Sequence, residues 1–445
     1  MNSVKSNTVA VIGLGYIGLP ILASLARCGN RVFGIDTDEN RIKQLRETYA
    51  PNFYEPELRE ILQEYRHNIE FTTDYKHASE CSTVLITVGT PLQDDQTPSY
   101  DQLDAAMGIG RYISKGCTVI LKSTVIPGTT EQYVIPRLEQ LSGLHAGRDF
   151  YVAFCPERTV EGAAIRELST LPKIIGGIDK ESTERAASFL SQLGDKIIKV
   201  SSPKVAELCK LVDNTFRAMN VAFANEIGMM CEQVGIDAYE VVAAVNNSYE
   251  RTKLFTPGLG ADGPCLHKDC HIFRTYARSN KADSSLVDAS VTKSTESTLR
   301  IEAIVSRFIE DKKIEKPVIS LVGLAFKGSP PTDDIRESTA LKIYEEFLKN
   351  TRFSDFIFRF HDPLVSRFCE TDVCATFTEC VQEANVVMFL TNNPDLMNID
   401  AHDIAASAGR PLLIIDCWHN VTNLKSIAND DNIDVFQVGS GWLKK

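Results

Sequence analysis

The chain has 445 residues, 43% of them hydrophobic and 24% charged, with a net charge of −12 from 47 basic and 59 acidic side chains. This length and composition are ordinary for a folded protein of two or three domains, and they exclude a wholly disordered, collagen-like or coiled-coil chain. The acidic balance argues against nucleic acid as the main partner, although a few local cations or a helix N-terminus suffice to bind a small phosphorylated ligand.

The first 200 residues alternate short β-branched runs with longer amphipathic stretches. This alternation predicts a parallel sheet with right-handed crossover helices, which is an α/β domain over residues 1–200. The predicted buried strands are Thr8–Gly13, Arg31–Asp36, Val84–Val88, Thr118–Ser123, Tyr151–Cys155 and Lys173–Gly177.

Two long helices are expected next, in a middle domain over residues 201–310. Apolar residues recur every three or four positions from Pro203 to about Gly235, which predicts one long helix with a wide apolar face. We expect this helix to connect two α/β units, and its apolar face makes it a candidate dimer interface. A second helical stretch covers about Ser284 to Asp311.

A second alternating unit begins at Lys316 and gives a C-terminal domain over residues 311–445. The predicted fold class is therefore α/β, with two Rossmann-like doubly wound domains joined by a long central helix in a helical middle domain. The strands predicted for the second unit are Val318–Val322, Phe356–His361, Val386–Leu390, Leu412–Asp416 and Asp434–Val438.

The sequence favours a cytoplasmic protein that neither crosses nor binds a membrane. No apolar run reaches the roughly 20 residues that a spanning helix needs. The polar stretch Met1 to Asn7 leads directly into the first strand and does not resemble a signal peptide. Twelve scattered cysteines without a CxxC pair indicate reduced thiols and no metal site.

The first chemical motif is a GxGxxG sequence formed by Gly13, Gly15 and Gly18. It follows a predicted strand and opens a predicted helix, as dinucleotide-binding turns do, because glycines allow the backbone to approach a pyrophosphate at the helix N-terminus. Asp36 ends the second strand and can accept hydrogen bonds from an adenosine ribose, which favours NAD over NADP. Arg41 complicates this choice because it could also approach the adenosine. A glycine turn that binds nothing is the alternative.

The second motif is a glycine-rich loop that ends in Cys265. If the following segment is helical, Cys265 and Asp269 share a face. A thiol at a helix N-terminus has a lowered pKa, and Lys268 would lower it further, so that Cys265 is a candidate nucleophile and Asp269 a candidate base. The alternative is a buried, inert cysteine.

Lys210 and Asn214 are four residues apart on the long predicted helix and therefore project side by side. A cation and an amide donor together can stabilise an oxyanion. A solvated helix face with no function is the alternative.

Together these motifs resemble the nucleotide-sugar 6-dehydrogenases, which oxidise UDP-glucose and UDP-N-acetylhexosamines. The resemblance spans nearly the whole chain and includes several ordered motifs. These are Val11–Pro20, Val88–Pro91, Lys122–Val125, Cys155–Arg158, Glu161-Gly162, Lys210 with Asn214, the Cys265 loop, Phe326–Gly328 and Arg336–Ser338.

The resemblance implies an NAD-dependent, two-step oxidation of a C6 hydroxyl to a uronate, with Cys265 as the nucleophile. The resemblance also implies roles for other residues: the catalytic set is Cys265, Lys210, Asn214, Asp269, Glu157 and Thr124. NAD would contact Gly13, Gly15, Tyr16, Ile17, Gly18, Asp36, Arg41, Val88, Thr90, Thr124, Glu161, Lys268 and Arg336. The UDP-sugar would contact Glu157, Arg158, Lys210, Asn214, Arg251, Phe255, Pro257, Gly258, Gly260, Phe326 and Lys327. Because Arg251 matches an arginine that reaches the neighbouring subunit's substrate, a homodimer or larger homo-oligomer is implied.

The chain departs from the family pattern at three places. Asp262 stands where glycine is usual, and Cys270 stands where proline is often found. The segment around Trp418 lacks an arginine that the family often carries there, which leaves the uridine end of the site open.

The choice of sugar rests on the resemblance alone. Cys155-Pro156-Glu157-Arg158 resembles the branch that acts on UDP-N-acetyl sugars, and we expect UDP-N-acetyl-D-mannosamine, with UDP-N-acetyl-D-glucosamine or UDP-glucose as alternatives. A non-catalytic nucleotide-sugar-binding protein and a one-step alcohol dehydrogenase on the same scaffold are the competing functions.

Overall fold

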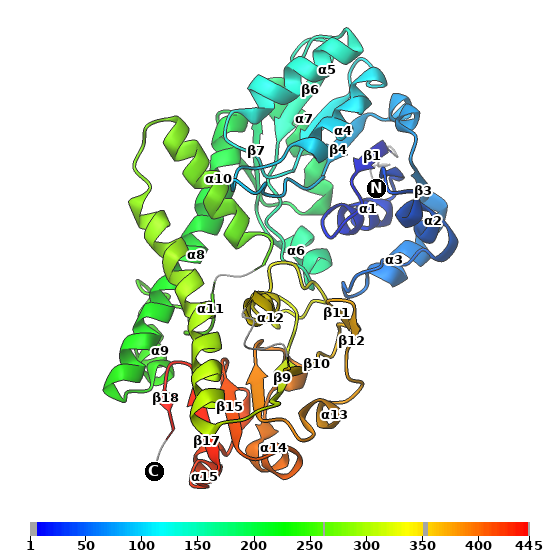
Figure 1. The fold of residues 1–445 in the computed structure, drawn as a ribbon. Coiled ribbons are helices and arrows are strands. Elements are labelled where there is room, and N and C mark those ends of the chain that lie inside the picture. Colours follow the sequence, from blue (N-terminus) through cyan, green and yellow to red (C-terminus); the bar gives the residue numbers. More distant parts are fainter. Residues whose placement is uncertain (1–6, 261–262, 350–354, 444–445) are drawn as a thin grey trace. The chain divides into compact units, whose positions relative to one another are not determined.

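The structure is a computed structural model that describes residues 7–260, 263–349 and 355–443. The described residues fall into two compact units (Figure 1). The first unit is Met1–Asn214 with His271–Asp283, and the second is Thr215–Cys270 with Ser284–Lys445. The division into three domains at residues 200 and 310 stays a prediction.

In the described part of the first unit, eight strands form one sheet in the order β3-β2-β1-β4-β5-β6-β7-β8. Neighbouring strands are parallel except for β6 and β7. The strands are β1 (Thr8–Ile12), β2 (Arg31–Ile35), β3 (Ile69–Thr72), β4 (Thr83–Ile86), β5 (Thr118–Leu121), β6 (Tyr151–Phe154), β7 (Lys173–Gly177) and β8 (Ile197–Lys199).

Helices cover both faces of this sheet, because alternate side chains of each strand point to opposite faces. Val9 and Val11 of β1 enter the hydrophobic cluster that packs against α1 and α7. Ala10 and Ile12 enter the cluster on the other face, against α4 and α5. The helices are α1 (Gly18–Arg27), α2 (Glu39–Thr48), α3 (Leu58–Glu64), α4 (Asp101–Met107), α5 (Ile135–Ser142), α6 (Ala164–Thr170) and α7 (Lys180–Leu190).

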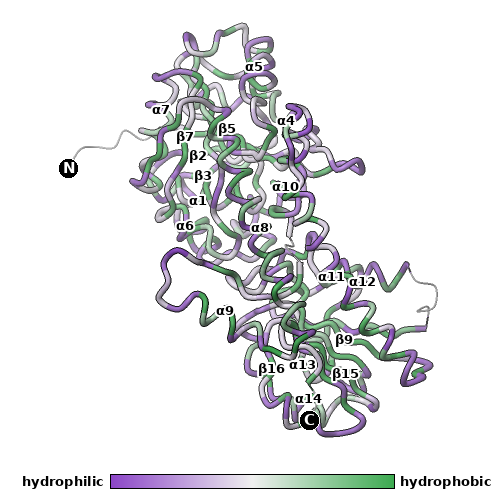
Figure 2. The backbone as a smooth tube through the Cα atoms, turned by 90° about the vertical axis from the view of Figure 1, so that its left-hand side faces the viewer, coloured by the Kyte–Doolittle hydropathy of each residue, from purple (hydrophilic) through white to green (hydrophobic). Residues whose placement is uncertain are grey.

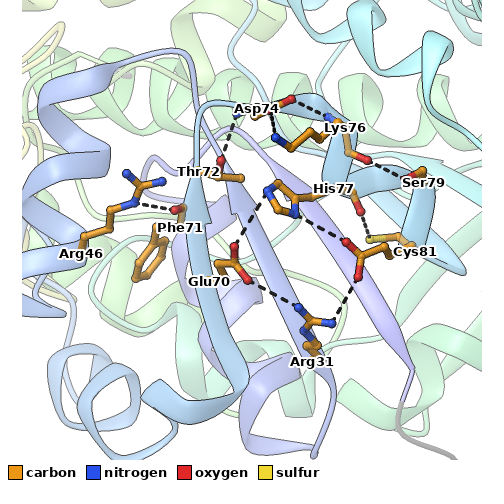
Figure 3. A network of polar contacts seen from close by, with 11 residues as sticks. Arg31, Arg46, Glu70, Phe71, Thr72, Asp74, Lys76, His77, Ser79 and Cys81 are labelled. Atoms are coloured by element: carbon orange, nitrogen blue, oxygen red, sulfur yellow. Dashed lines mark hydrogen bonds and ion pairs between the residues drawn. The ribbon is translucent and has the colours of Figure 1, made fainter.

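The edge of this sheet at β3 is closed by a polar network (Figure 3). Arg31 of β2 lies between Glu70 of β3 and Glu80, at 3.5 and 3.3 Å. His77 lies within 3.9 Å of Glu70 and 3.6 Å of Glu80, and its ring stacks on Phe33. Charged side chains at an edge strand hinder pairing with another chain, so this network protects an otherwise open ladder.

In the described part of the second unit, six strands form a sheet in the order β10-β9-β13-β15-β17-β18, with only β18 antiparallel to its neighbour. α11 and α12 pack on one face, and α13, α14 and α15 on the other. The strands are β9 (Val318–Val322), β10 (Ile357–His361), β13 (Val386–Phe389), β15 (Leu412–Asp416), β17 (Ile433–Gln437) and β18 (Gly441–Trp442). Short pairs are β11 (Arg367–Phe368) with β12 (Thr371–Asp372), and β14 (Ile399–Asp400) with β16 (Val421–Thr422).

The remaining helices include the longest of the described chain, α8 (Pro203–Val234), which the apolar periodicity predicted. Figure 2 shows the strands of both sheets as mainly hydrophobic segments, in green. The other helices are α9 (Ala238–Asn246), α10 (Leu266–Ser279), α11 (Ser285–Lys312), α12 (Thr339–Lys349), α13 (Phe377–Val381), α14 (Ala401–Ser407) and α15 (Leu424–Ile427).

The α/β class is confirmed, but two details of the first sheet differ from prediction. Lys173–Gly177 was expected to be parallel throughout, yet β7 pairs antiparallel with β6 through Gly176 and Gly177. The strands β3 and β8 were not predicted. Both lie at the ends of the sheet, where alternating or exposed side chains weaken the hydrophobic signal of a buried strand.

The same kind of turn follows β1 in the first sheet and β9 in the second. After β1, Gly13 has a positive φ of 89°, its N–H donates to Ile35, and the N–H of Leu14 donates to the Asp36 carboxylate at 2.8 Å. After β9, Gly323 has a φ of 84°, its N–H donates to His361, and the N–H of Leu324 donates to the Asp362 carboxylate at 2.7 Å. We call this device the glycine–aspartate turn.

Candidate functional site

The three glycines of the first turn each meet a different steric demand. A Cβ on Gly18 would lie 1.8 Å from the carbonyl oxygen of Gly13, so only glycine lets α1 begin this close to β1. A Cβ on Gly13 would lie 3.0 Å from Val88. Beside Gly15, by contrast, no heavy atom of the described chain lies within 4 Å of the Cβ position, apart from Gly15 itself and its two chain neighbours.

The N-terminus of α1 is open toward that space. Within the described chain no side chain caps it, and Ile17 precedes its first residue. A helix N-terminus with room beside a glycine is the arrangement that holds a pyrophosphate. Gly13, Gly15, Tyr16, Ile17 and Gly18 therefore fit a dinucleotide. The turn lies at the switch point between β1 and β4, where open α/β sheets bind ligands.

Asp36 is buried at this turn and already holds several groups. Its carboxylate accepts from the N–H groups of Leu14 and Asp38, at 2.8 and 3.0 Å. Arg41 donates to the same carboxylate at 2.9 Å and lies 3.8 Å from Asp38. The cation predicted near the adenosine thus partly neutralises the carboxylate that was expected to select NAD.

The ends of β4 and β5 bring further predicted residues to the same edge of the sheet. Val88 follows β4 and contacts Gly13, and the hydroxyl of Thr90 donates to the carbonyl of Thr124 at 2.6 Å. Thr124 follows β5, so its backbone is fixed beside Val88 and Thr90. The sequence predicted these residues as separate motifs, and the parallel sheet places them at one edge.

Glu157 follows β6 and is held from two sides. Its Oε1 accepts from the N–H groups of Arg158 and Thr159 at 2.8 and 3.0 Å. Its Oε2 lies 3.3 Å from the Nζ of Lys122. Burial raises the pKa of Glu157, but the Lys122 charge and the two N–H donors more than offset it and hold the pKa below its usual value. The side chain of Arg158 pairs with Asp213 at 3.0 Å.

Glu161 is buried, and the loop that carries it is fixed by a carboxylate that sequence reasoning missed. Glu55 accepts from the N–H groups of Gly162 and Ile165, at 2.7 and 3.3 Å. Glu55 is itself 7% exposed. Its place could not be read from the sequence because it lies more than 100 residues from its partners.

The first-unit part of α8 carries Lys210, which is half-buried, and Asn214, which is buried. One turn earlier, the buried carboxylate of Glu207 accepts from the N–H of Gly128 and from the N–H and hydroxyl of Thr130. Burial raises the pKa of Glu207 despite these donors. Glu207 therefore anchors the turn that follows Thr124 and does not lie on a solvated helix face.

In the second unit, Cys265 directly precedes α10 and is exposed. The N–H of Asp269 donates to the carbonyl of Cys265 at 2.9 Å, which closes the first helical turn. Asp269 is completely buried and pairs with Lys268 at 2.7 Å. Cys270 is buried, 1% exposed. The helix that the Cys265 hypothesis required is thus present.

Three asparagines hold the segment 253–259 that leads to Cys265. Asn225 of α8 donates to the carbonyl of Leu259 at 2.6 Å and accepts from the N–H of Gly258 at 2.9 Å. Asn220 does the same for Lys253 and Phe255, and Asn246 holds both backbone groups of Leu254. Sequence reasoning missed all three, because an asparagine that pairs with distant backbone leaves no local motif.

The glycines and proline of this loop are packed closely. A Cβ on Gly258 would lie 2.6 Å from the Trp418 ring, and one on Gly260 would lie 2.7 Å from Ser294. Gly228 of α8 leaves room for Pro257, whose carbonyl accepts from the Tyr239 hydroxyl. The glycine-rich loop is therefore fitted to its surroundings over residues 257–260.

The second glycine–aspartate turn carries Phe326 and Lys327 at the switch point between β9 and β13. Phe326 lies against Gly263, where a Cβ would be 2.3 Å from its ring. The turn leads to Gly328 and not into a helix, so the Lys327 amine is the positive group that the turn itself carries. Arg336 is held in a bidentate pair by Asp334, with nitrogen–oxygen distances of 2.6 to 3.0 Å.

The structure shows where several of the departures from the family pattern lie. The segment after β15 lacks the family arginine and instead wedges Trp418 against Gly258, with the indole N–H on the carbonyl of Leu390. Arg251 is exposed beside the ring of Tyr249. Asp262 lies outside the described residues. Within those residues, no group of three or more His, Cys, Asp or Glu side chains could hold a metal ion, and no helix is long and apolar enough to span a membrane.

The predicted residues thus form two sets. The first unit brings together the glycine turn, Asp36, Arg41, Val88, Thr90 and Thr124, with Glu157 and Glu161 farther along the same strand ends. The second unit brings together the 253–260 loop, Cys265, Lys268, Asp269, Phe326 and Lys327. The residues that fix these groups, Lys122, Glu55, Glu207, Asn225 and Asp334, were not predicted as site residues.

Comparison with known proteins gives one answer over almost the whole chain. The NAD-binding, central and UDP-binding domain models of the UDP-glucose/GDP-mannose dehydrogenase family match residues 7–193, 204–295 and 320–423. A UDP-N-acetyl-D-mannosamine dehydrogenase of Pyrococcus horikoshii is 32% identical over 91% of this chain and 94% of its own. An NDP-N-acetyl-D-galactosaminuronic acid dehydrogenase of Ralstonia nicotianae is 28% identical over 88% of this chain and 92% of its own.

The fold agrees with these matches. A solved structure of the Pyrococcus horikoshii UDP-D-ManNAc dehydrogenase superposes with a TM-score of 0.86 at 29% identity, and it covers 98% of this chain and 99% of that one. Both the predicted resemblance and the predicted enzyme class are confirmed. The chain therefore belongs to the UDP-glucose/GDP-mannose dehydrogenase family and is a nucleotide-sugar dehydrogenase.

Proposed function

We propose that this enzyme oxidises the C6 hydroxyl of UDP-N-acetyl-D-mannosamine to the uronate, using two NAD per sugar. The observation that carries the proposal is the exposed Cys265 thiol at the first turn of α10, at the end of a loop anchored by Asn225. A simple alcohol dehydrogenase needs no nucleophile at such a place, whereas oxidation beyond the aldehyde does.

The cofactor would be held by the glycine turn, Asp36 and Arg41. Among the described residues, Gly15 has open space beside it and no side chain caps the start of α1, and this space fits a pyrophosphate. When bound, NAD supplies the hydride acceptor. Asp36 would repel a 2′-phosphate, and this supports NAD over NADP. Thr90, Thr124, Val88 and Glu161 would line the same edge, and Lys268 and Arg336 are further proposed contacts of the cofactor.

In the first step, the C6 hydroxyl loses a hydride and a proton and becomes an aldehyde. The Cys265 sulfur then bonds to C6, and the oxygen takes up a proton to give a thiohemiacetal. Loss of a second hydride and the hydroxyl proton gives a thioester. Lys210 and Asn214 would stabilise the negative charge that develops on the C6 oxygen.

Water then attacks C6, the carbon–sulfur bond breaks, and Cys265 returns to the thiolate. Glu157 would accept a proton from this water, with Thr124 positioning it, and Asp269 would assist proton transfer. Overall, one hydroxymethyl group, two NAD and one water give one carboxylate, two NADH and three protons. The nucleotide sugar would be held by Arg158, Phe255, Pro257, Gly258, Gly260, Phe326 and Lys327.

The choice of sugar is supported by the names of the relatives, since the Pyrococcus horikoshii protein is named for UDP-N-acetyl-D-mannosamine. UDP-N-acetyl-D-glucosamine and UDP-glucose are the alternatives. A cytoplasmic location stays a prediction, which the twelve scattered cysteines without a CxxC pair support.

The test is a panel of UDP-sugars with NAD, in which NADH absorbance is compared with the sugar consumed. Two NADH per molecule of UDP-N-acetyl-D-mannosamine, with a uronate product, support the proposal. One NADH with an accumulating aldehyde would indicate a one-step dehydrogenase. A higher kcat/KM for another sugar would overturn the substrate assignment while leaving the mechanism in place.

We further propose a homodimer formed through α8, with Arg251 reaching the partner's substrate. In the second unit, Phe216, Phe223 and Met230 repeat every seven residues on α8, and their exposed fractions are 64, 58 and 56%. An apolar row of this length on the surface supports a protein interface.

A further inference from the structure

Lys122 is a buried lysine that the proposed mechanism does not use. It directly follows β5, and its side chain is 4% exposed. The Nζ donates to the carbonyl of Cys155 at 3.2 Å and lies 3.3 Å from the Oε2 of Glu157. Because β5 and β6 are parallel neighbours, Lys122 and Glu157 extend from adjacent strand ends. A buried charge needs a partner, and this one has Glu157.

The two oxygens of Glu157 have different surroundings. Oε1 is occupied by the N–H groups of Arg158 and Thr159. Oε2 is buried and accepts no hydrogen bond from any described residue, and its close contact is the ion pair with Lys122. Oε2 is therefore the oxygen that keeps unused hydrogen-bonding capacity, and Lys122 fixes the direction in which it points.

The charges around the pair keep both partners ionised. Burial lowers the pKa of Lys122, but Cys155 and Glu157 more than offset it and raise that pKa overall. The other groups that face the pair are the Cys155 thiol and Lys173 of β7. Burial raises the pKa of the Cys155 thiol, and burial together with the Lys122 charge lowers the pKa of Lys173. Lys173 itself donates to the carbonyls of Leu168 and Leu193 and not to Glu157.

We propose that Lys122 is a positioning residue that holds the Glu157 carboxylate in place and keeps it ionised, ready to accept a proton from the hydrolytic water. The inference rests on the proposed function, in which water attacks the C6 thioester. In that step the water oxygen bonds to C6, its proton passes to the Glu157 carboxylate, and the carbon–sulfur bond breaks to release the Cys265 thiolate. Lys122 touches neither water nor substrate and acts through Glu157.

The experiment compares Lys122→Met with the wild-type enzyme over a range of pH, with UDP-N-acetyl-D-mannosamine and NAD. An opposite charge at this distance shifts a carboxyl pKa by about 1–3 units, so we expect the acidic limb of kcat to move to higher pH by about that amount. At neutral pH two NADH per active site should form as a burst, and the acylated enzyme should accumulate, as seen by mass spectrometry of the denatured protein. Lys122→Arg should restore part of the wild-type profile.

Lys173→Met is the matched control, because it removes a second buried lysine of the same sheet that donates to carbonyls and not to Glu157. We expect its acidic limb to stay in place. If Lys122→Met keeps the wild-type limb without acyl-enzyme while the wild type yields two NADH per sugar, the inference is wrong and the proposed function stands. If the wild type yields only one NADH, both fail together.

A double variant covers the case in which Lys122→Met does not fold. Glu157→Gln removes the carboxylate that the lost lysine leaves unpaired, so the double variant should melt at a higher temperature than Lys122→Met. It should also hydrolyse the acyl-enzyme no more slowly than Glu157→Gln alone, because Lys122 has nothing left to position. A further loss of tenfold or more in the double variant would contradict the inference.

Discussion

The surroundings of the Cys265 thiol differ from those of most cysteines in this chain. Cys265 and Cys369 are exposed, whereas the others are buried or half-buried. Burial raises the pKa of Cys81 and of Cys117 to about 12, so these thiols stay protonated at neutral pH. Reactivity toward an aldehyde requires a thiol that is deprotonated and that is also accessible to the substrate. Cys265 is accessible, because it is exposed.

Cys265→Ser should keep the fold and both binding sites but lower uronate formation by orders of magnitude, because serine is a much poorer nucleophile at neutral pH. NADH formation and a mass search for a slow ester adduct measure this. Cys270→Ser, which replaces a buried thiol five residues on, should stay within a few-fold of the wild type. Normal uronate formation by Cys265→Ser, or its loss in Cys270→Ser alone, would mean that the nucleophile is wrongly assigned.

Cofactor choice depends on the balance between Asp36 and Arg41. The ion pair at 2.9 Å partly neutralises the carboxylate that would repel a 2′-phosphate. The enzyme should prefer NAD, and Arg41→Ala should lower kcat/KM for NADP more than for NAD because Asp36 then stands unpaired. Steady-state rates with both cofactors decide this. A clear preference of the wild type for NADP, or a gain of NADP use in Arg41→Ala, would contradict the electrostatic argument.

Among the elements, the loop before Cys265 depends on α8. Asn225 is 2% exposed, and its loss would leave the N–H of Gly258 and the carbonyl of Leu259 buried without partners. Each buried unsatisfied group costs about 1–3 kcal/mol. Asn225→Ala should therefore lower the melting temperature and raise KM for the UDP-sugar, while NAD binding stays unchanged.

Asn220→Ala is the control for this effect, because Asn220 makes the same pair of bonds to the more exposed segment of Lys253 and Phe255. The loss of the Asn220 side chain should lower the melting temperature and raise KM by less than the loss of Asn225, since water can replace the missing hydrogen bonds. Equal effects of the two variants on KM would show that the Asn225 hydrogen bonds to Gly258 and Leu259 have no special role in holding the loop.

Sequence patterns found the elements more reliably than their partners. Buried strands such as β1 and β15 were predicted to within one residue, because a β-branched run bounded by turn residues leaves few alternatives. The direction of β7 was predicted wrongly, since the sequence of a strand buried on both faces looks the same whether the strand is parallel or antiparallel to its neighbour. The long α8 was predicted from its periodicity, but several residues of its apolar face, including Phe216 and Phe223, are exposed.

The candidate site shows the same limit. Motif residues such as Gly13, Gly18 and Cys265 were found because their chemistry needs a local pattern. Lys122, Glu55 and Asn225 act on partners 35, 107 and 34 residues away, which only the fold brings close. Residues that position a catalytic group over such distances leave no spacing rule to detect.

On the scale of the whole molecule, the exposed row on α8 predicts the oligomeric state. Phe223→Glu places a charge in the middle of the row Phe216, Phe223 and Met230, and we expect it to convert a dimer to a monomer. Light scattering coupled to size exclusion measures the mass. Leu348→Glu, which changes an apolar residue of α12 that is 61% exposed, should leave the dimer intact. A monomeric wild type, or a dimeric Phe223→Glu, would rule out this interface.

The glycine–aspartate turn occurs once in each unit, with Gly13, Leu14 and Asp36 in one and Gly323, Leu324 and Asp362 in the other. The sequences that form the two turns also run in parallel, as Gly-Leu-Gly-Tyr-Ile-Gly and Gly-Leu-Ala-Phe-Lys-Gly. Such a doubled plan suits descent from one ancestral half by duplication. Once doubled, one copy is free to drift toward a new base or sugar while the other keeps the same redox cofactor. The family is named for both UDP-glucose and GDP-mannose, two substrates that differ in base and in sugar, while its NAD-binding domain is shared.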